Sequence, residues 1–215
     1  MTTIDKQGKV FRVQSRIARL VLTAVAMLMA MSVLGAGTAA AARTDGMQSY
    51  KGIDPEQWLR DVDTALSTAS ADLRGRVAQG GKLAIVFDID DTTLATDFAI
   101  DRDNIPAVDG SLKLAKEADQ SGVEVFYITN RNYASTNSPS KTRIALERAG
   151  LPVHTIYHRT PGDSRGKQEM KTAYRAQIED DGYTIIQNVG NNWTDLNGGH
   201  AERTYKLPDY DGKLQ

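Results

Sequence analysis

A short apolar run that ends in a cluster of acids is the feature that most constrains this chain. Residues 83–87 are continuously apolar, as expected of a strand buried on both faces of a sheet. Asp88, Asp90 and Asp91 follow at once, with two threonines behind them. Carboxylates this close repel, so at least one should have a raised pKa unless a cation lies among them. The cluster therefore indicates a divalent metal and a reaction that needs a carboxylate nucleophile and a proton carrier.

Apolar runs and helical periodicities alternate along the rest of the chain. Helical spacing and stop signals predict helices at 54–80, up to 122, at 138–150 and up to 182. Continuous apolar runs predict strands at 83–87, 123–128, 152–157, 183–189 and, more weakly, 204–207. Strands that alternate with helices imply parallel pairing with right-handed crossovers. The expected fold class is therefore α/β, a Rossmann-like three-layer fold with a mainly parallel sheet.

The N-terminus has the pattern of a secretory signal peptide over residues 1–42. Five cations and one acid in residues 1–19 precede an apolar stretch from Leu20 to Leu34, and small residues up to Ala42 supply a cleavage signal. An uncleaved membrane anchor is the alternative, since the apolar stretch can be extended to Ala42. The small, weakly apolar end of the stretch favours cleavage. We therefore expect a secreted, extracellular protein with no stable membrane anchor.

The chain that remains after cleavage suits a single exported domain. It would have 173 of the 215 residues and a net charge of −5. Residues 43–54 are expected to form a polar leader and residues 55–215 the folded domain. A mildly acidic export product is a poor candidate for nucleic-acid binding. The sequence has no cysteine, so stability must come from packing rather than from disulfides. A homo-oligomer stays open.

Polar residues follow several predicted strands and should meet at the carboxyl edge of the sheet. Asp88 can attack phosphorus and become an aspartyl phosphate. Asp90 can protonate the leaving oxygen and then activate water. Thr129, which follows the second strand, and a lysine can hold the phosphoryl oxygens. Oxygen ligands from Asp88, the Asp90 carbonyl and the 191–195 loop suit Mg²⁺.

These motifs together resemble the haloacid dehalogenase superfamily. Within it, the sequence is most similar to the acid phosphatase group that includes plant vegetative storage proteins and bacterial class B and C acid phosphatases. That group usually has Glu where this chain has Asp91. The resemblance extends over about residues 55–210. Three of its motifs are matched by Asp88-Ile89-Asp90-Asp91-Thr92, Phe126–Arg131 and Gly190–Leu196.

A further motif of this group identifies the lysine. It places a lysine eleven residues before the glycine that matches Gly182, which selects Lys171 rather than Lys167. The resemblance implies an enzyme, an acid phosphatase that hydrolyses small-molecule phosphomonoesters with Mg²⁺. The implied catalytic residues are Asp88, Asp90, Thr129 and Lys171. The implied substrate-binding residues are Thr129, Asn130, Arg131 and Lys171. The implied metal ligands are Asp88, Asp90, Asn191 and Asp195.

Asn191 departs from the pattern, because the group usually has Asp there. An amide oxygen can ligate a metal but brings no charge. A binding or storage protein that kept the fold and lost turnover is therefore the alternative function. A receiver-like phosphate-accepting switch would also use Asp, Thr and Lys, but an exported switch lacks a phosphodonor. A calcium loop at Asp88 is disfavoured, because the spaced acids, central Gly and terminal Glu of an EF-hand are missing.

The spacing of the motifs also bears on access to the site. Only 40 residues separate Asp88 from Thr129, too few for a large cap domain. An open site implies broad substrates, a macromolecular one, or a cap from another subunit. Trp193 is expected to pack its loop, with stacking on a substrate as the lesser interpretation. Arg131 and Arg159 follow strand ends and could steer phosphate.

Overall fold

The computed structural model describes residues 43–132 and 138–214. The chain divides into two compact units, residues 1–43 and 44–215, and only the second is considered below. The predicted signal peptide, residues 1–42, lies outside the described residues. In the part of the chain that the structure describes, no helix is long and apolar enough to span a membrane.

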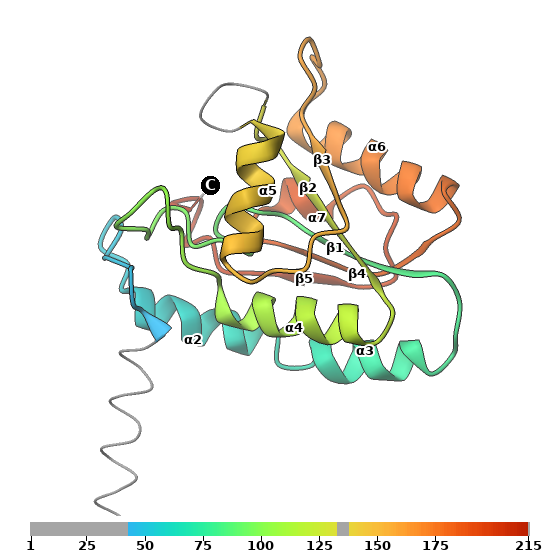
Figure 1. Ribbon diagram of the computed structural model, residues 1–215, viewed down its shortest axis with the longest axis horizontal. Coiled ribbons are helices and arrows are strands. Elements are labelled where there is room, and N and C mark those ends of the chain that lie inside the picture. Colours follow the sequence, from blue (N-terminus) through green and yellow to red (C-terminus); the bar gives the residue numbers. More distant parts are fainter. Residues whose placement is uncertain (1–42, 133–137, 215) are drawn as a thin grey trace, which may run out of the picture. The chain divides into compact units, whose positions relative to one another are not determined.

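A single sheet of five parallel strands forms the centre of the second unit (Figure 1). Its order is β3-β2-β1-β4-β5, so the chain runs outward from β1 to β3 and then crosses back to β4. The switch between these two directions lies between β1 and β4, where ligands bind in sheets of this type. The strands are β1 Leu83–Phe87, β2 Glu124–Thr129, β3 Thr155–His158, β4 Thr184–Gly190 and β5 Thr204–Lys206.

Helices cover both faces of the sheet. The α2, α3 and α4 helices lie on one face and α6 on the other, as Figure 1 shows. The three-layer α/β prediction is therefore confirmed, and the segment between β1 and β2 has turns and one helix rather than a cap domain. The helices are α2 Pro55–Ala65, α3 Ala69–Val77, α4 Asp109–Gln120, α5 Pro139–Arg148, α6 Lys167–Asp180 and α7 Trp193–Leu196.

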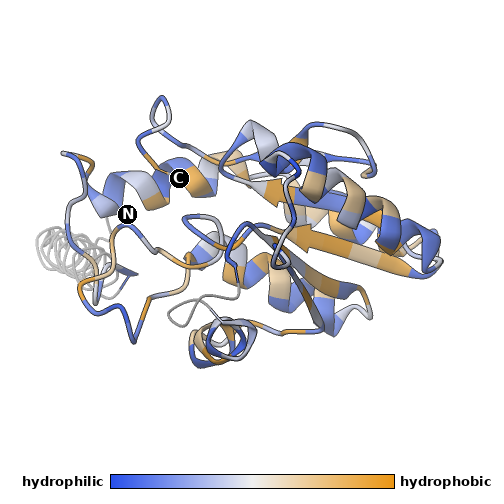
Figure 2. Ribbon diagram, turned by 90° about the horizontal axis from the view of Figure 1, so that it is seen from above, coloured by the Kyte–Doolittle hydropathy of each residue, from blue (hydrophilic) through white to orange (hydrophobic). Residues whose placement is uncertain are grey.

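Burial on both faces explains the unbroken apolar run of β1. Ile85 and Phe87 join the larger core beneath α2 to α4, whereas Ala84 and Val86 join a smaller core that includes Ile178 of α6. Figure 2 shows hydrophobic residues along the strands and mixed residues on the helices. A strand with two covered faces has no polar side, so its sequence does not alternate.

One long helix was predicted from residue 54 to residue 80, and the structure has two. The N-terminal cap is as expected, since Asp54 accepts a hydrogen bond from the Gln57 amide at 2.9 Å. The break comes where Ser67 donates to the Thr64 carbonyl at 3.2 Å, three residues back, in place of the α-helical bond. Buried apolar residues continue on both sides of this turn. Apolar periodicity alone therefore could not locate it.

Residues 44–53 are packed on the domain, which differs from the expected polar leader. Met47 and Ile53 are buried and belong to the larger core. Met47 also forms an antiparallel bridge with Ala99 in the segment before α4. The compact unit thus begins at Thr44 instead of Pro55. The reason is that two apolar side chains in a mostly polar stretch suffice to fix it to the core.

Candidate active site

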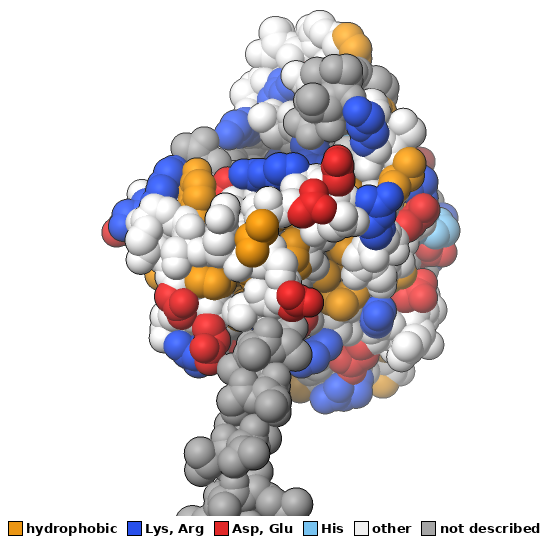
Figure 3. Space-filling view, turned by 60° about the vertical axis from the view of Figure 1, so that its left-hand side comes forward, with side chains coloured by type: hydrophobic (Ala, Val, Ile, Leu, Met, Phe, Trp, Pro, Cys, Tyr) orange, Lys and Arg blue, Asp and Glu red, His pale blue; other side chains and the backbone are white. Residues whose placement is uncertain are grey.

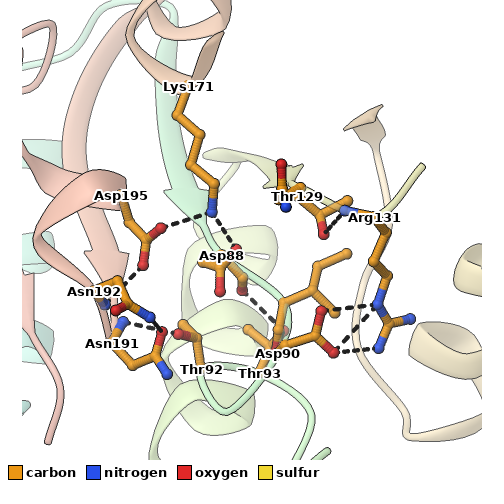
Figure 4. A network of polar contacts seen from close by, with 12 residues as sticks. Asp88, Asp90, Thr92, Thr93, Thr129, Arg131, Lys171, Asn191, Asn192 and Asp195 are labelled. Carbon is orange, nitrogen blue, oxygen red and sulfur yellow. Dashed lines mark hydrogen bonds and ion pairs between the residues drawn. The ribbon is translucent and has the colours of Figure 1, made fainter. Parts of the chain in front are cut away.

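The acidic cluster lies at the carboxyl end of β1, beside the end of β4 (Figure 4). Asp88 follows β1 directly, and its N–H donates to the Val189 carbonyl at 2.9 Å. Its own carbonyl accepts from the Thr93 hydroxyl at 3.1 Å. These hydrogen bonds hold the backbone of Asp88 as an extension of the strand, so the position of its Cα is fixed.

A tight turn then separates the three acids. The amides of Thr93 and Leu94 both donate to the Ile89 carbonyl at 3.0 Å. Asp91 has a φ of 52°, in the left-handed region that aspartate tolerates better than most residues. Its buried carboxyl accepts from the Asp97 amide at 2.9 Å. Burial raises the pKa of Asp91 to about 9, so this acid is neutral and does not add to the charge of the cluster.

Lys171 of α6 reaches into the cluster and bridges two carboxylates, as Figure 4 shows. Its Nζ donates to Oδ1 of Asp88 at 2.5 Å and to Oδ1 of Asp195 at 2.7 Å. The residue is only 4% exposed. Burial lowers the pKa of Lys171, but the two carboxylates outweigh burial and the net direction is upward, so the ammonium stays charged.

The bridge leaves more negative than positive charge at the site. One ammonium faces the carboxyl groups of Asp88 and Asp195. Burial raises the pKa of Asp88 to about 7, and the attraction of Lys171 opposes this rise. Either a proton or a further cation must neutralise the excess carboxylate. A divalent metal would do so and would leave Asp88 ionised.

Asp195 is placed by the turn that joins β4 to α7. Its Oδ2 accepts from the Asn192 amide at 2.8 Å, and the Asn192 side chain completes a reciprocal cap at the start of α7. Gly190 makes this possible, because a Cβ there would lie 2.5 Å from the Asp195 Cβ. The glycine is thus required by a close approach of Asp195 to the backbone.

We expect Gly190→Ala to destabilise the protein by about 1–3 kcal/mol, because the added methyl group must push Asp195 away from Lys171. The free energy of unfolding in urea measures this effect. Gly75→Ala is the matched control, since a Cβ at Gly75 of α3 meets nothing within 4 Å. It should be neutral or slightly stabilising. Equal stability of the two variants would contradict the packing argument.

The end of β2 supplies the opposite wall. The Thr129 hydroxyl accepts from the Arg131 amide at 3.1 Å, and the Arg131 guanidinium donates to both oxygens of Asp90, at 2.6 and 3.0 Å. Burial raises the pKa of Asp90, but the contacts with Arg131 outweigh it and the net direction is downward. The Asn130 side chain accepts from Arg159 at 2.7 Å, so Arg159 positions Asn130 from behind.

Side chains from the carboxyl ends of β1, β2 and β4 and from the start of α6 line one cavity of about 260 Å³. Asn191 does not line it, whereas the other seven residues predicted for the site do. Lys167, rejected above as the catalytic lysine, lies exposed on the same wall. Asn132, Asn192 and Thr194 also line it; Asn132 was not predicted, and the other two were predicted only as part of the 191–195 loop. Their positions just beyond the ends of β2 and β4 were the available signal. The predicted lining residues are Asp88, Asp90, Thr129, Asn130, Arg131, Lys171 and Asp195.

The donor set for a metal is rich in oxygen but poor in free carboxylates. Among the described residues, no three His, Cys, Asp or Glu side chains are arranged to hold an ion. Asp195 already accepts from Lys171 and from the Asn192 amide. Asn191 is fully buried, and its Nδ2 has no partner in the described part of the chain. Its Oδ1 accepts from the Asn192 side chain at 3.0 Å, so a half-turn of the amide would give up that hydrogen bond and place the oxygen at the unpaired position. Asp88, the Asp90 carbonyl and Asn191 therefore fit a hard cation such as Mg²⁺.

The chain belongs to the HAD superfamily, subfamily IIIB, the acid phosphatase subfamily, whose sequence profile matches residues 96–213. The predicted family resemblance is thereby confirmed. The stem 28 kDa glycoprotein of Glycine max is 29% identical over 117 residues, 51% of this chain and 44% of that protein. Acid phosphatase 1 of Solanum lycopersicum is 29% identical over 152 residues, 60% of this chain and 58% of that protein. The chain thus spans about half the length of these curated relatives.

Solved structures support the same fold. The class C acid phosphatase from Bacillus anthracis aligns with a TM-score of 0.53 at 22% identity, over 67% of each chain. A chain of the Pnkp1/Rnl/Hen1 complex aligns with a TM-score of 0.52 at 15% identity, over 60% of this chain and 47% of that one. Identities this low establish the fold and leave the chemistry to the site itself.

Proposed function

We propose that this protein is a secreted, Mg²⁺-dependent acid phosphatase that hydrolyses small-molecule phosphomonoesters through an aspartyl-phosphate intermediate. The observation that carries the proposal is the convergence of four side chains on one cavity: the carboxyls of Asp88 and Asp90, the Thr129 hydroxyl and the buried Lys171 ammonium. They come from the ends of two neighbouring strands and from α6. Membership of the acid phosphatase subfamily supports the same reaction class.

The contacts assign each residue a step. Lys171 holds Oδ1 of Asp88, so the other oxygen is the one that attacks phosphorus, forming the acyl phosphate as the ester P–O bond breaks. Asp90 gives a proton to the departing oxygen. Asp90 then takes a proton from water, whose oxygen attacks phosphorus and releases phosphate and Asp88. A bound Mg²⁺ held by Asp88, the Asp90 carbonyl and Asn191 would supply charge neutralisation of the phosphoryl group.

Arg131 must change partners during this cycle. Its bidentate bond with Asp90 stabilises the carboxylate, whereas a general acid needs a proton. A phosphoryl dianion in the cavity competes for the same guanidinium, because planar bidentate donors suit phosphate as well as carboxylate. Substrate binding would thus weaken the hold on Asp90 and favour its protonation. Thr129 and Asn130 remain to orient the phosphoryl oxygens.

Asp90→Asn should let the protein be phosphorylated but slow the release of phosphate, since the nucleophile survives and the base does not. Substrates with good leaving groups should retain a first turnover, and acid-quench experiments should trap phosphoprotein. Asp180→Asn is the control, because it removes an exposed carboxylate at the end of α6 that lines neither the reaction cavity nor the neighbouring hollow. Equal losses for good and poor leaving groups, with no trapped intermediate, would contradict this role.

Asn191→Asp should lower the Mg²⁺ concentration needed for half-maximal activity, because a carboxylate adds a full charge toward a hard cation. The metal-free variant should be less stable than the parent and gain more from Mg²⁺, since the new charge repels Asp88. Asn132→Asp is the control, because it adds the same charge at an exposed position on the cavity wall that is not a proposed ligand. It should change the half-saturating Mg²⁺ concentration less than Asn191→Asp does. A Mg²⁺ titration in which activity and melting temperature are both recorded measures the two effects. An unchanged or higher half-saturation would remove Asn191 from the ligand set.

A catalytically weakened binding or storage protein of the same fold is the second candidate. The observation that favours it is the uncharged Asn191 at the proposed metal position, since among the described residues no three His, Cys, Asp or Glu side chains are arranged to hold an ion. Hydrolysis of a chromogenic phosphomonoester, measured with and without Mg²⁺, separates the two candidates. Metal-stimulated turnover that depends on Asp88 supports the phosphatase. Phosphate binding without turnover supports the alternative.

A further inference from the structure

A second hollow lies on the other side of the Asp90–Arg131 ion pair. Its volume is about 620 Å³, against about 260 Å³ for the reaction cavity. Asp90 and Arg131 line both spaces, so the ion pair is the partition between them. The other walls of this side hollow come from α5 and from the segment 96–105. Nothing in the roles assigned above uses this space.

The side hollow has an excess of positive charge. Apart from the Asp90–Arg131 pair, three cations line it, Arg102, Lys141 and Arg148, against one carboxylate, Asp103. Within the described residues none of the three cations forms an ion pair. Arg148 donates to the Asp103 carbonyl at 2.5 Å and Arg102 to the Thr96 carbonyl. Carbonyls orient a guanidinium without neutralising it. Figure 3 shows basic side chains gathered on the upper part of this face of the molecule.

Apolar side chains lie between these cations. Ile144 of α5 lines the side hollow and is 51% exposed. Ile105 and Ala145 complete the apolar part of the wall. A space of this size, with an apolar wall and a few fixed polar groups, has the make-up of a site for a small organic ligand. The charges select an anionic one.

We propose that the side hollow binds the leaving group, and that the preferred substrates are phosphomonoesters whose leaving group carries an apolar body and a second anionic group. The proposal rests on the proposed function, because it takes Asp90 as the group that protonates the departing oxygen. That oxygen must leave beside Asp90, and the side hollow begins there. The phosphoryl group then occupies the reaction cavity next to Lys171, and the second anion meets Lys141 and Arg148.

A pair of matched substrates tests the charge requirement. 4-(Carboxymethyl)phenyl phosphate has the distal anion, and its primary amide, 4-(carbamoylmethyl)phenyl phosphate, has the same shape without it. We expect kcat/KM to be about fivefold higher for the acid, as a few partly exposed charge contacts would give, with most of the difference in KM. The preference should shrink as ionic strength rises. Equal kcat/KM for the two substrates would overturn the proposal.

Variants place the effect in the side hollow. Lys141→Gln removes an exposed cation whose side chain has no hydrogen bond in the described residues, so it should fold normally and still reduce the preference. Lys141→Gln/Arg148→Gln should abolish it. Lys113→Gln/Lys116→Gln removes the same charge from exposed positions on α4 and is the matched control. An undiminished preference in the side-hollow variants, or an equal loss in the control, would contradict the assignment.

Binding of the free phenols, without the phosphate group, tests the side hollow independently of the phosphatase activity. Calorimetry should show that 4-hydroxyphenylacetate binds the native protein more tightly than 4-hydroxyphenylacetamide, and that the Lys141→Gln/Arg148→Gln variant does not discriminate. This result without any hydrolysis would support the side hollow while refuting the phosphatase. Hydrolysis of both phosphates, with neither a kinetic nor a binding preference for the acid, would retain the phosphatase and refute the side hollow.

Discussion

Asp88→Asn should abolish phosphatase activity and leave the fold intact. The amide has nearly the shape of the carboxylate and can still accept the hydrogen bond from Lys171, but it cannot attack phosphorus. Loss of one carboxylate from a site with excess negative charge should not destabilise the protein. Turnover of a chromogenic phosphomonoester and the melting temperature measure the two effects. More than about a tenth of the parent turnover would show that Asp88 is not the nucleophile.

Substitution of the neighbouring Asp91 is a stringent control for Asp88→Asn. Asp91 is fully buried, and its pKa of about 9 keeps it protonated at neutral pH. Its carboxyl accepts from the Asp97 amide and, when protonated, shares a hydrogen bond with the Asp97 side chain; an asparagine amide offers both an acceptor and a donor for these contacts. Asp91→Asn should therefore retain most of the turnover, although it makes the same chemical change three residues along the chain. A comparable loss in Asp91→Asn would contradict the neutral, structural role assigned to Asp91.

Lys171→Met should abolish activity and destabilise the protein by about 3–5 kcal/mol at neutral pH, because it leaves two buried carboxyl groups without their shared cation. Lys167→Met is the matched control, since Lys167 lies exposed on the wall of the same cavity. Its effect on stability should stay within about 0.5 kcal/mol. Urea unfolding of both variants measures the difference. A destabilisation of Lys171→Met no larger than that of the control would contradict the bridge with Asp88 and Asp195.

The loss in Lys171→Met should depend on pH. Burial already raises the pKa of Asp88 to about 7, and removal of the opposing Lys171 raises it further. Between the usual carboxyl pKa, about 3.9, and this raised value, the folded variant binds more protons than the unfolded chain. Its stability should therefore increase as the pH falls from neutral toward 4. In a double-mutant cycle, Asp195→Asn should recover part of the stability lost in Lys171→Met.

The sequence by itself determined the sheet and the order of its motifs. The apolar run at 83–87 coincides with β1, and the expected strands at 123–128 and 183–189 match β2 and β4 within a residue or two. Strands buried on both faces leave a strong local signal, because every residue must be apolar. Chemistry that requires particular side chains directly after such strands leaves an equally local one, as at Asp88 and Thr129.

Tertiary packing determined features of the fold and the site that no local sequence pattern predicts. The break between α2 and α3 lies inside a continuous apolar pattern, and Met47 is fixed to the core by Ala99, more than 50 residues away. Asp195 was predicted as a metal ligand, and the folded chain adds contacts that the spacing did not indicate, since its carboxylate accepts from Lys171 and caps α7. The Arg131–Asp90 partition and the side hollow behind it depend on segments that meet only in the folded chain. Sequence spacing fixes which groups follow each strand, whereas distances between side chains depend on how strands and helices pack, and those distances set partners and pKa values.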